Sequence, residues 1–203
     1  MRTLAPTLAL LLLLAACGSE GHDTVEPRGR PSATAVPAAP GVVTTRGLVT
    51  VMDTGVPELC LGAVAESWPP QCDGPRIEGW DWVDHPGTFE RSGSVRWGEY
   101  RVEGLWDGTT FTYQGAIPAA AYDAAPEPAP SGAPASGRLG PAELQAVADE
   151  LLRNLPGAQT AAVEGDRVVV GVTYDDGSLQ DQVDAAHGAG TVVLVPALVD
   201  VEG

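Results

Sequence analysis

The sequence predicts an α+β protein of two domains, a five-stranded OB-like β-barrel followed by a two-layer αββαβ sandwich. Residues 42–117 consist of short β-branched and aromatic runs separated by turn residues, which is typical of a small all-β domain. Residues 139–203 alternate between helical and strand patterns, which favours helices packed on one face of a sheet. Residues 118–138 between them are rich in proline and alanine and predict a linker.

The first domain contains five strand candidates. Asp107-Gly108 separates the last two, and this dipeptide is a strong signal for a hairpin turn. In the fourth candidate the apolar alternation slips by one residue at Gly98-Glu99, which predicts a β-bulge. One long bent strand among four short ones favours an OB-type barrel over a seven-stranded sandwich. The candidates are residues 42–52, 59–64, 76–83, 94–106 and 109–115.

The second domain predicts the order helix, strand, strand, helix, strand. Pro141 and Glu143 suit a helix N-terminus, because proline fits the first turn and a carboxylate is stabilised there by the helix dipole. Ser178 and Asp181 have the spacing of a capping box and predict the second helix. A three-stranded sheet with both helices on one face follows from this order. The strand candidates are residues 159–163, 167–174 and 191–201.

The N-terminal segment predicts export and a lipid anchor. Arg2 precedes an apolar run that ends in Leu-Ala-Ala-Cys at Cys17, the arrangement of a secretory signal with a bacterial lipobox. This run holds about 15 residues, fewer than the roughly 20 that a transmembrane helix needs. We expect residues 1–16 to be a cleaved signal peptide and residues 17–41 to be a diacylglyceryl-modified cysteine with a disordered tether. The chain is then held on the extracytoplasmic face of the cell membrane.

Cys60 and Cys72 are predicted to form a disulfide. Lipidation of Cys17 leaves only these two of the three cysteines, and thiols pair by default in an oxidising compartment. Closing a loop of this length stabilises a fold by roughly 3 kcal/mol in the chain-entropy model. A zinc site is disfavoured, because two cysteines without nearby histidine or cysteine partners make a poor ligand set.

The charge of the chain argues against anionic partners. The formal net charge is −16 at pH 7, and the candidate barrel has five arginines against 11 acidic residues. OB barrels that bind single-stranded nucleic acid need a positive groove, so no nucleic-acid partner is expected. Anionic lipid headgroups are repelled as well. The membrane is therefore expected as a partner only through the lipid anchor at Cys17.

All five tryptophans lie within residues 68–106, in the candidate barrel. Trp80 and Trp82 share a strand face, and together with Trp68 and His85 they make a candidate binding face for a glycan or a protein. The alternative is that the tryptophans fill the core of a small barrel, which needs large side chains.

Neither a metal site nor a catalytic site is expected. Asp81, Asp84, His85 and Glu90 could ligate a divalent cation, but no recognised spacing organises them, and solvated loop charges are the preferred interpretation. The Gly-x-Ser-x-Gly and His-Glu-x-x-His motifs and the phosphate-binding glycine loops are absent from the sequence. We therefore expect no cofactor and no enzymatic activity.

Six segments of the chain carry a resemblance, namely residues 47–53, 58–62, 69–72, 79–82, 95–98 and 174–179. Together they resemble a set of uncharacterised actinobacterial lipoproteins. The resemblance covers most of the chain after the tether, implies an envelope lipoprotein, and carries no activity. The αββαβ order is also similar to the BON domain of envelope proteins, by topology alone.

These observations predict a membrane-anchored extracytoplasmic lipoprotein that acts as a non-catalytic binding or interaction module. Its partner is expected to be an envelope protein. Glycan or cell-wall binding through the tryptophan-rich barrel is the alternative, and an envelope hydrolase is a less favoured one.

Overall fold

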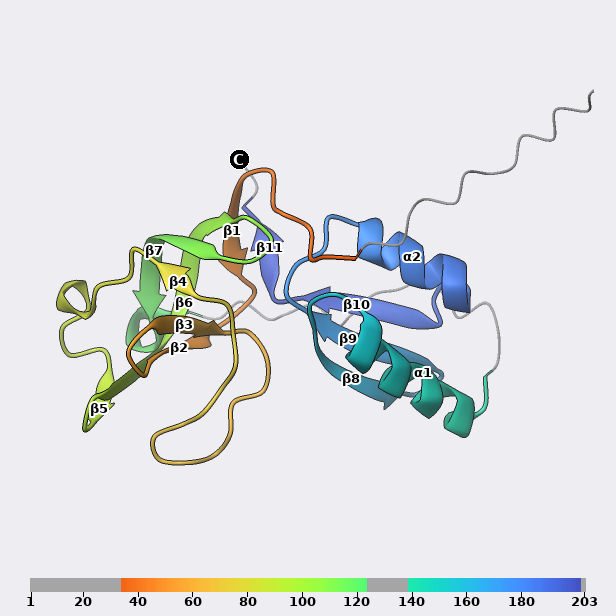
Figure 1. Ribbon diagram of the computed structural model, residues 1–203, viewed down its shortest axis with the longest axis horizontal. Helices are drawn as coiled ribbons and strands as arrows, with labels where there is room; N and C mark the ends of the chain where they lie inside the picture. The colour runs from red at the N-terminus through yellow and green to blue at the C-terminus, as the bar shows by residue number, and fades with distance from the viewer. Residues whose placement is uncertain (1–33, 124–138, 202–203) are drawn as a thin grey trace, which may run out of the picture. The chain divides into compact units, whose positions relative to one another are not determined.

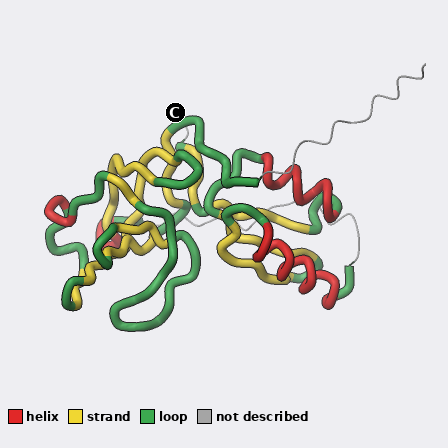
Figure 2. Tube along the Cα trace, viewed as in Figure 1, coloured by secondary structure: helices red, strands yellow, loops and turns green. Residues whose placement is uncertain are grey.

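The computed structural model describes residues 34–123 and 139–201 (Figure 1). These residues form a curled, mostly antiparallel sheet and a smaller three-stranded sheet with two helices, so the α+β class is confirmed (Figure 2). The predicted signal peptide, the lipidation site Cys17 and residues 124–138 of the predicted linker lie outside the described residues. Within those two ranges, no helix is long and apolar enough to cross a membrane.

The curled sheet is built around one long strand, β6 (Val95–Trp106). One edge of β6 pairs with β1 (Val42–Thr45) and then β2 (Val49–Asp53), which follow each other along it in antiparallel register. Its other edge pairs with β5 (Glu90–Ser92) and β7 (Phe111–Pro118). A hairpin joins β6 and β7 at the predicted place, but its loop is residues 107–110 and not the two residues Asp107-Gly108 alone.

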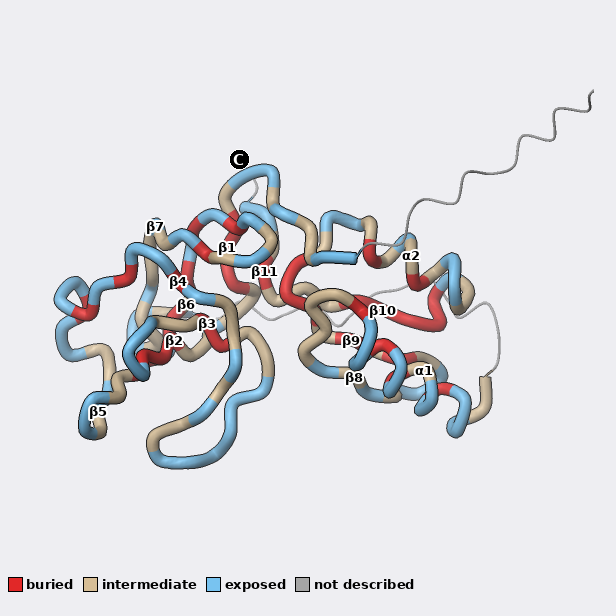
Figure 3. The backbone as a smooth tube through the Cα atoms, in the orientation of Figure 1, coloured by how far each residue is buried: buried red, intermediate tan, exposed pale blue. Residues whose placement is uncertain are grey.

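Two short strands bring the margins of the sheet together. β3 (Pro57–Cys60) pairs antiparallel with β2, and β4 (Ile77–Glu78) pairs parallel with β7. An isolated antiparallel bridge between Glu58 and Arg76 links β3 to β4. The sheet therefore curls around an apolar interior, and buried residues lie on β1, β2 and β6 (Figure 3). Its core is Val43, Val51, Leu59, Ile77, Trp80, Trp82, Tyr100, Val102, Trp106, Phe111, Tyr174 and Leu198.

The slip of alternation at Gly98 is not a bulge, because the register of β6 against β2 runs without interruption through this residue. Trp97 and Tyr100 instead face opposite sides of β6, as residues three apart in a strand must. Tyr100 lies in the main core, whereas Trp97 packs on the outer face of the sheet. A Cβ at position 98 would lie 2.7 Å from the Tyr100 ring, so glycine is needed there. The register shift in β6 lies between Glu103 and Gly104.

The smaller sheet has the strand order β10-β9-β8, with β8 (Ala158–Glu164) antiparallel and β10 (Val192–Pro196) parallel to β9 (Arg167–Val172). Helices α1 (Pro141–Asn154) and α2 (Ser178–His187) flank it in the chain order that the sequence predicts. Both helices pack against one apolar core on this sheet, α1 over β8 and β9 and α2 over β10. The shared core is Leu144, Ala148, Leu151, Leu155, Leu179 and Val183 with Val168, Val170, Val172, Val192 and Leu194.

The last strand candidate, residues 191–201, is divided in the structure. β10 ends at Pro196, which has no N–H to donate, and β11 (Leu198–Asp200) pairs antiparallel with β1 of the curled sheet. The Tyr174 side chain lies in the core of the curled sheet, and its hydroxyl donates a hydrogen bond of 3.0 Å to Asp200. The prediction of a single terminal strand is therefore wrong. The division into two domains joined by residues 118–138 stays a prediction.

Candidate functional site

The structure separates the four residues of the predicted binding face by burial. Trp80, Trp82 and His85 are only 8%, 4% and 8% exposed, respectively, and the two tryptophans belong to the main core. Trp68 is 70% exposed and contacts a different tryptophan, Trp97. The structure thus brings three of the four together in the interior and presents the fourth to solvent.

Trp80 and His85 stack on each other inside the curled sheet, with ring centroids 4.0 Å apart. Tyr100 and Tyr113 stand edge-on to Trp80 at 4.9 and 5.1 Å. Burial lowers the pKa of His85 below its ordinary value of 6.5, although the charge of Asp84 opposes this shift. Among the described residues, neither His85 Nε2 nor Trp80 Nε1 has a hydrogen-bond partner. The neutral imidazole is therefore part of the aromatic packing.

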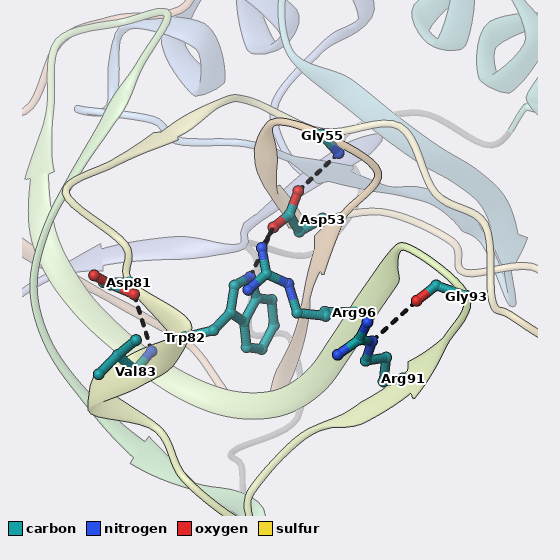
Figure 4. A network of polar contacts seen from close by, with 8 residues as sticks. All are labelled: Asp53, Gly55, Asp81, Trp82, Val83, Arg91, Gly93 and Arg96. Atoms are coloured by element: carbon teal, nitrogen blue, oxygen red, sulfur yellow. Dashed lines mark hydrogen bonds and ion pairs between the residues drawn. The ribbon is translucent and has the colours of Figure 1, made fainter.

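A buried carboxylate connects Trp82 to the sheet (Figure 4). Asp53, at the end of β2, accepts hydrogen bonds from Trp82 Nε1 at 2.9 Å, from Arg96 at 2.7 Å and from the Gly55 backbone N–H at 2.7 Å. The Arg96 guanidinium also lies 5.6 Å from the centre of a Trp82 ring. Asp53 is only 3% exposed, and three donors compensate its desolvation. This network fixes the short 3₁₀ helix η1 (Trp82–Asp84) against β2 and β6. The prediction that Trp80 and Trp82 share a strand face is wrong, because β4 already ends at Glu78.

A groove of about 910 Å³ is lined by strands of the curled sheet and by the long loop that follows β3. Its floor includes Thr50, Cys60 and Trp97, which alternate with core residues and so face away from the main core. We call it the Trp68 groove. It is lined by residues 48–50, 60–62, 64–68, 70, 87–90, 97–99 and 118–120.

The loop that carries Trp68 is closed by the predicted disulfide between Cys60 and Cys72, which is confirmed. This disulfide packs with Met52 and Trp97 in a small cluster on the outer face of the sheet. The Trp68 ring stands edge-on to Trp97, with centroids 4.9 Å apart. The loop is therefore fixed to the sheet by a covalent bond and by an aromatic contact.

The loop also has its own hydrogen bonds. The Ala65 N–H donates to the Gln71 carbonyl at 2.8 Å, and the same two residues form an antiparallel bridge across the loop. The Ser67 hydroxyl donates to the Pro69 carbonyl at 2.8 Å. These bonds hold the segment on both sides of Trp68, so the exposed indole is presented in a defined position.

The charged side chains that line the Trp68 groove are all acidic. They are Glu66, Glu90 and Glu99, and each is exposed. Within residues 34–123 and 139–201, none of the three carboxylates takes part in an ion pair. Because opposite charge is missing from the groove, it attracts cationic groups and repels anionic ones.

The five arginines of the curled-sheet region are engaged away from the groove. Two of them form ion pairs with carboxylates, and three donate to carbonyl or hydroxyl oxygens. The pairs are Arg76 with Glu78 and Arg96 with Asp53, and the donations are from Arg46 to Pro196, from Arg91 to Gly93 and from Arg101 to Thr44.

The groove offers contact surfaces and hydrogen-bond acceptors. The side chains considered as metal ligands, Asp81, Asp84, His85 and Glu90, do not converge: in the described parts of the chain, no three His, Cys, Asp or Glu residues lie close enough to hold a metal ion. The Ser67 hydroxyl, which lines the groove, already donates to a carbonyl. The groove therefore presents aromatic and apolar side chains together with carboxylate oxygens.

Sequence reasoning missed Trp97 as the support of the site and the groove itself. A signal for the first was present, because Trp97 and Tyr100 differ in strand parity and therefore face opposite sides of β6. A second signal was the placement of Trp68 between the two predicted disulfide partners. The groove forms where segments that are distant in the sequence meet, so no local sequence pattern could have predicted it.

Comparisons of the chain with protein-family models, with curated proteins and with solved structures find no match.

Proposed function

We propose that this chain is a lipid-anchored, non-catalytic binding module on the extracytoplasmic face of the cell membrane, and that it captures its partner in the Trp68 groove. The observation that carries the proposal is the 70% exposure of Trp68 on a disulfide-closed loop at the rim of a groove. Large exposed aromatic side chains beside a concave surface are typical of interaction sites.

The fixed position of Trp68 favours binding energetically. Tryptophan is enriched among the residues that dominate interface energies, because it buries a large area at low conformational cost. A loop that is already ordered by a disulfide and by Trp97 loses little further entropy when a partner binds. The partner then gains the burial of the indole without ordering the loop.

The location rests on the N-terminal pattern and is supported by the disulfide. Two acyl chains at Cys17 give stable membrane attachment, whereas one chain binds only marginally. The Cys60–Cys72 bond is of the kind that persists in oxidising compartments outside the cytosol. Fractionation of cells that express Cys17→Ser tests the anchor, and release of this variant from the membrane fraction is the expected result.

We also propose that the curled sheet is an OB-like barrel. The support is the order in which its strands pair. β2 pairs with β3, β3 is linked to β4, β4 pairs with β7, β7 pairs with β6, and β6 pairs with β1 and β2. The single parallel pair in this ring is β4 with β7, and η1 stands between β4 and β6 in the chain. Such a barrel presents loops on a closed scaffold for recognition.

The binding proposal is tested by measuring how much purified protein is retained on envelopes isolated from a strain that lacks the gene for this protein. Trp68→Ala removes the exposed indole and is expected to lower retention at least about tenfold. Val83→Ala is the matched control, since Val83 is 79% exposed and does not line the groove. Equal retention of Trp68→Ala and Val83→Ala, with both variants folded, contradicts the proposal.

Glycan binding is the second candidate, and the exposed indole favours it, because aromatic faces suit sugar rings. Carboxylates such as Glu66 can accept hydrogen bonds from sugar hydroxyls. The test is retention on purified cell-wall material, which Trp68→Ala should weaken. Substitution of Trp80 or Trp82 is unsuited to this test, because both side chains are buried in the core.

A further inference from the structure

We infer that the partner of the Trp68 groove is a basic protein segment, bound in an extended form with its arginine or lysine side chains against Trp68 and the groove carboxylates. This inference rests on the proposed function and specifies the chemistry of the ligand.

The first argument is the charge of the groove. Glu66, Glu90 and Glu99 are exposed and unpaired within the described ranges, and no arginine is among the lining residues. Every arginine of the curled-sheet region is engaged in a contact outside the groove lining; Arg91, for example, donates to the Gly93 carbonyl (Figure 4). A cationic ligand would complement these carboxylates, and a phosphate or other anion would be repelled.

The second argument is the exposed indole. Tryptophan is the best side-chain partner for a guanidinium or ammonium group above an aromatic face. The protein already contains one such arrangement, since Arg96 lies 5.6 Å from a Trp82 ring centre. Trp68 has no such partner among the cation–ring contacts of the described residues, and its 70% exposure leaves room for an external cation.

The third argument is the shape of the site. The groove has a volume of about 910 Å³, near the upper end of the range for ligand pockets, which suits several residues of an extended chain. Apolar side chains such as Leu61 and Phe89 line it together with the carboxylates. An extended basic segment presents charged tips and apolar stems, and both find complementary surfaces here. A neutral glycan leaves the three carboxylates without a countercharge.

The whole chain would assist this encounter. Its net charge of −16 attracts basic partners at long range and raises their association rate at low ionic strength. Binding should therefore weaken as salt screens this field.

The inference is tested with full-length protein lacking the signal peptide and three probes: acetyl-(Arg-Ala)₃-amide, acetyl-(Glu-Ala)₃-amide and a neutral N-acetylglucosamine hexamer. Isothermal titration measures the dissociation constant of each. The basic peptide is expected to bind the wild type. Its affinity should fall at least about tenfold between roughly 50 and 500 mM NaCl, and Trp68→Ala should not bind it. The acidic peptide and the glycan are expected not to bind.

Two triple variants with the same change of net charge separate groove binding from general attraction. The first variant removes the groove carboxylates by combining Glu66→Gln, Glu90→Gln and Glu99→Gln. Its affinity for the basic peptide should be at least about tenfold lower than that of the wild type. The control removes three exposed carboxylates that do not line the groove. It combines Glu103→Gln, Glu150→Gln and Glu164→Gln and should stay within about twofold of the wild type.

Equal weakening in the two triple variants overturns the inference, and so does preferential binding of the glycan or absence of binding by the basic peptide. If envelope retention still depends on Trp68 in any of these cases, the binding proposal stands and only the ligand class is wrong. If Trp68→Ala is retained on envelopes like the wild type, the binding proposal itself fails.

Discussion

Trp68 stands edge-on to Trp97, with ring centroids 4.9 Å apart and ring planes at 89°. Trp68 is 70% exposed and Trp97 only 6%, so the pair joins a solvent-facing ring to a buried one. Trp97 in turn packs with Met52 and Cys60 on the outer face of the sheet. The exposed indole therefore has a rigid support, which a binding surface needs in order to lose little entropy on association.

Loss of the support should weaken the site. We expect Trp97→Leu to lower the free energy of unfolding by roughly 2–4 kcal/mol, because buried area and an aromatic pair are lost. It should also reduce retention on envelopes. Trp97→Phe keeps an aromatic ring against Trp68 and should lower stability and envelope retention less than Trp97→Leu does. Urea denaturation and the retention assay measure the two effects. Unchanged retention of folded Trp97→Leu would show that Trp68 does not depend on this support.

The disulfide should act on the same loop. Cys60→Ser with Cys72→Ser is expected to lower the free energy of unfolding by roughly 2–4 kcal/mol, since the unfolded chain regains freedom. Retention on envelopes should fall as well, because the Trp68 loop loses its covalent closure. A double variant that is destabilised but retained like the wild type would assign the bond to stability alone.

The buried carboxylate of Asp53 should be a sensitive position. We expect Asp53→Asn to cost roughly 2–4 kcal/mol of unfolding free energy, because one acceptor oxygen and the countercharge of Arg96 are lost in a buried place. Arg96→Gln should cost less, since the Arg96 side chain is 39% exposed and solvent screens its pairing. Urea denaturation of both variants tests this order, and a larger loss in Arg96→Gln would refute it.

His85 should make stability depend on pH in the mildly acidic range. Burial lowers the pKa of His85 below 6.5, so the unfolded chain binds more protons than the folded protein below that pH. Stability is then fully present above about pH 6.5 and decreases as the pH falls. The facing groups are Asp81, Asp84, Tyr100 and Tyr113.

His85→Phe removes this titration and leaves an aromatic ring beside Trp80. Urea denaturation between about pH 5 and pH 8 should show a flatter pH profile for the variant than for the wild type. Two profiles of the same slope would mean that His85 titrates alike in the folded and unfolded states.

Tyr174 should make stability depend on pH in the alkaline range. Burial first, and then the hydrogen bond to Asp200, raise the pKa of Tyr174 to about 12. The neutral phenol is favoured in the folded protein, so its contribution is complete below about pH 10 and is lost as the pH rises toward 12.

Tyr174→Phe should lower the free energy of unfolding by about 1 kcal/mol at neutral pH, since one hydrogen bond is lost. It should also remove part of the alkaline decrease. Denaturation between pH 8 and about 12, with phenolate absorbance as a second readout, measures both effects. Titration of all tyrosines in the wild type at their ordinary pKa would contradict the expected burial of Tyr174.

Features that depend on neighbouring residues were predictable from the sequence. The hairpin at Asp107-Gly108 follows from turn chemistry, because the Asp107 carboxylate accepts hydrogen bonds from the backbone of Thr109 and Thr110. The Cys60–Cys72 disulfide follows from the cysteine count and the expected compartment.

Features that depend on distant pairing were not predictable. β11 lies next to β1 although the two strands come from opposite ends of the described chain, and no local pattern specifies that register. Similarly, the residues next to Trp68 and Trp82 do not by themselves specify which of the two indoles is buried. Only the Asp53 network and the aromatic core decide that Trp82 is buried while Trp68 is exposed.

The central claim is that a partner occupies the Trp68 groove, and site-specific photo-crosslinking in living cells tests it most directly. A photoreactive residue replaces Val64, which lines the groove, or Leu152, an exposed apolar residue of α1. We predict a discrete crosslinked product from position 64 that disappears when Trp68→Ala is added, and no such product from position 152. A product from position 152 alone, or one from position 64 that persists in Trp68→Ala, would contradict the claim.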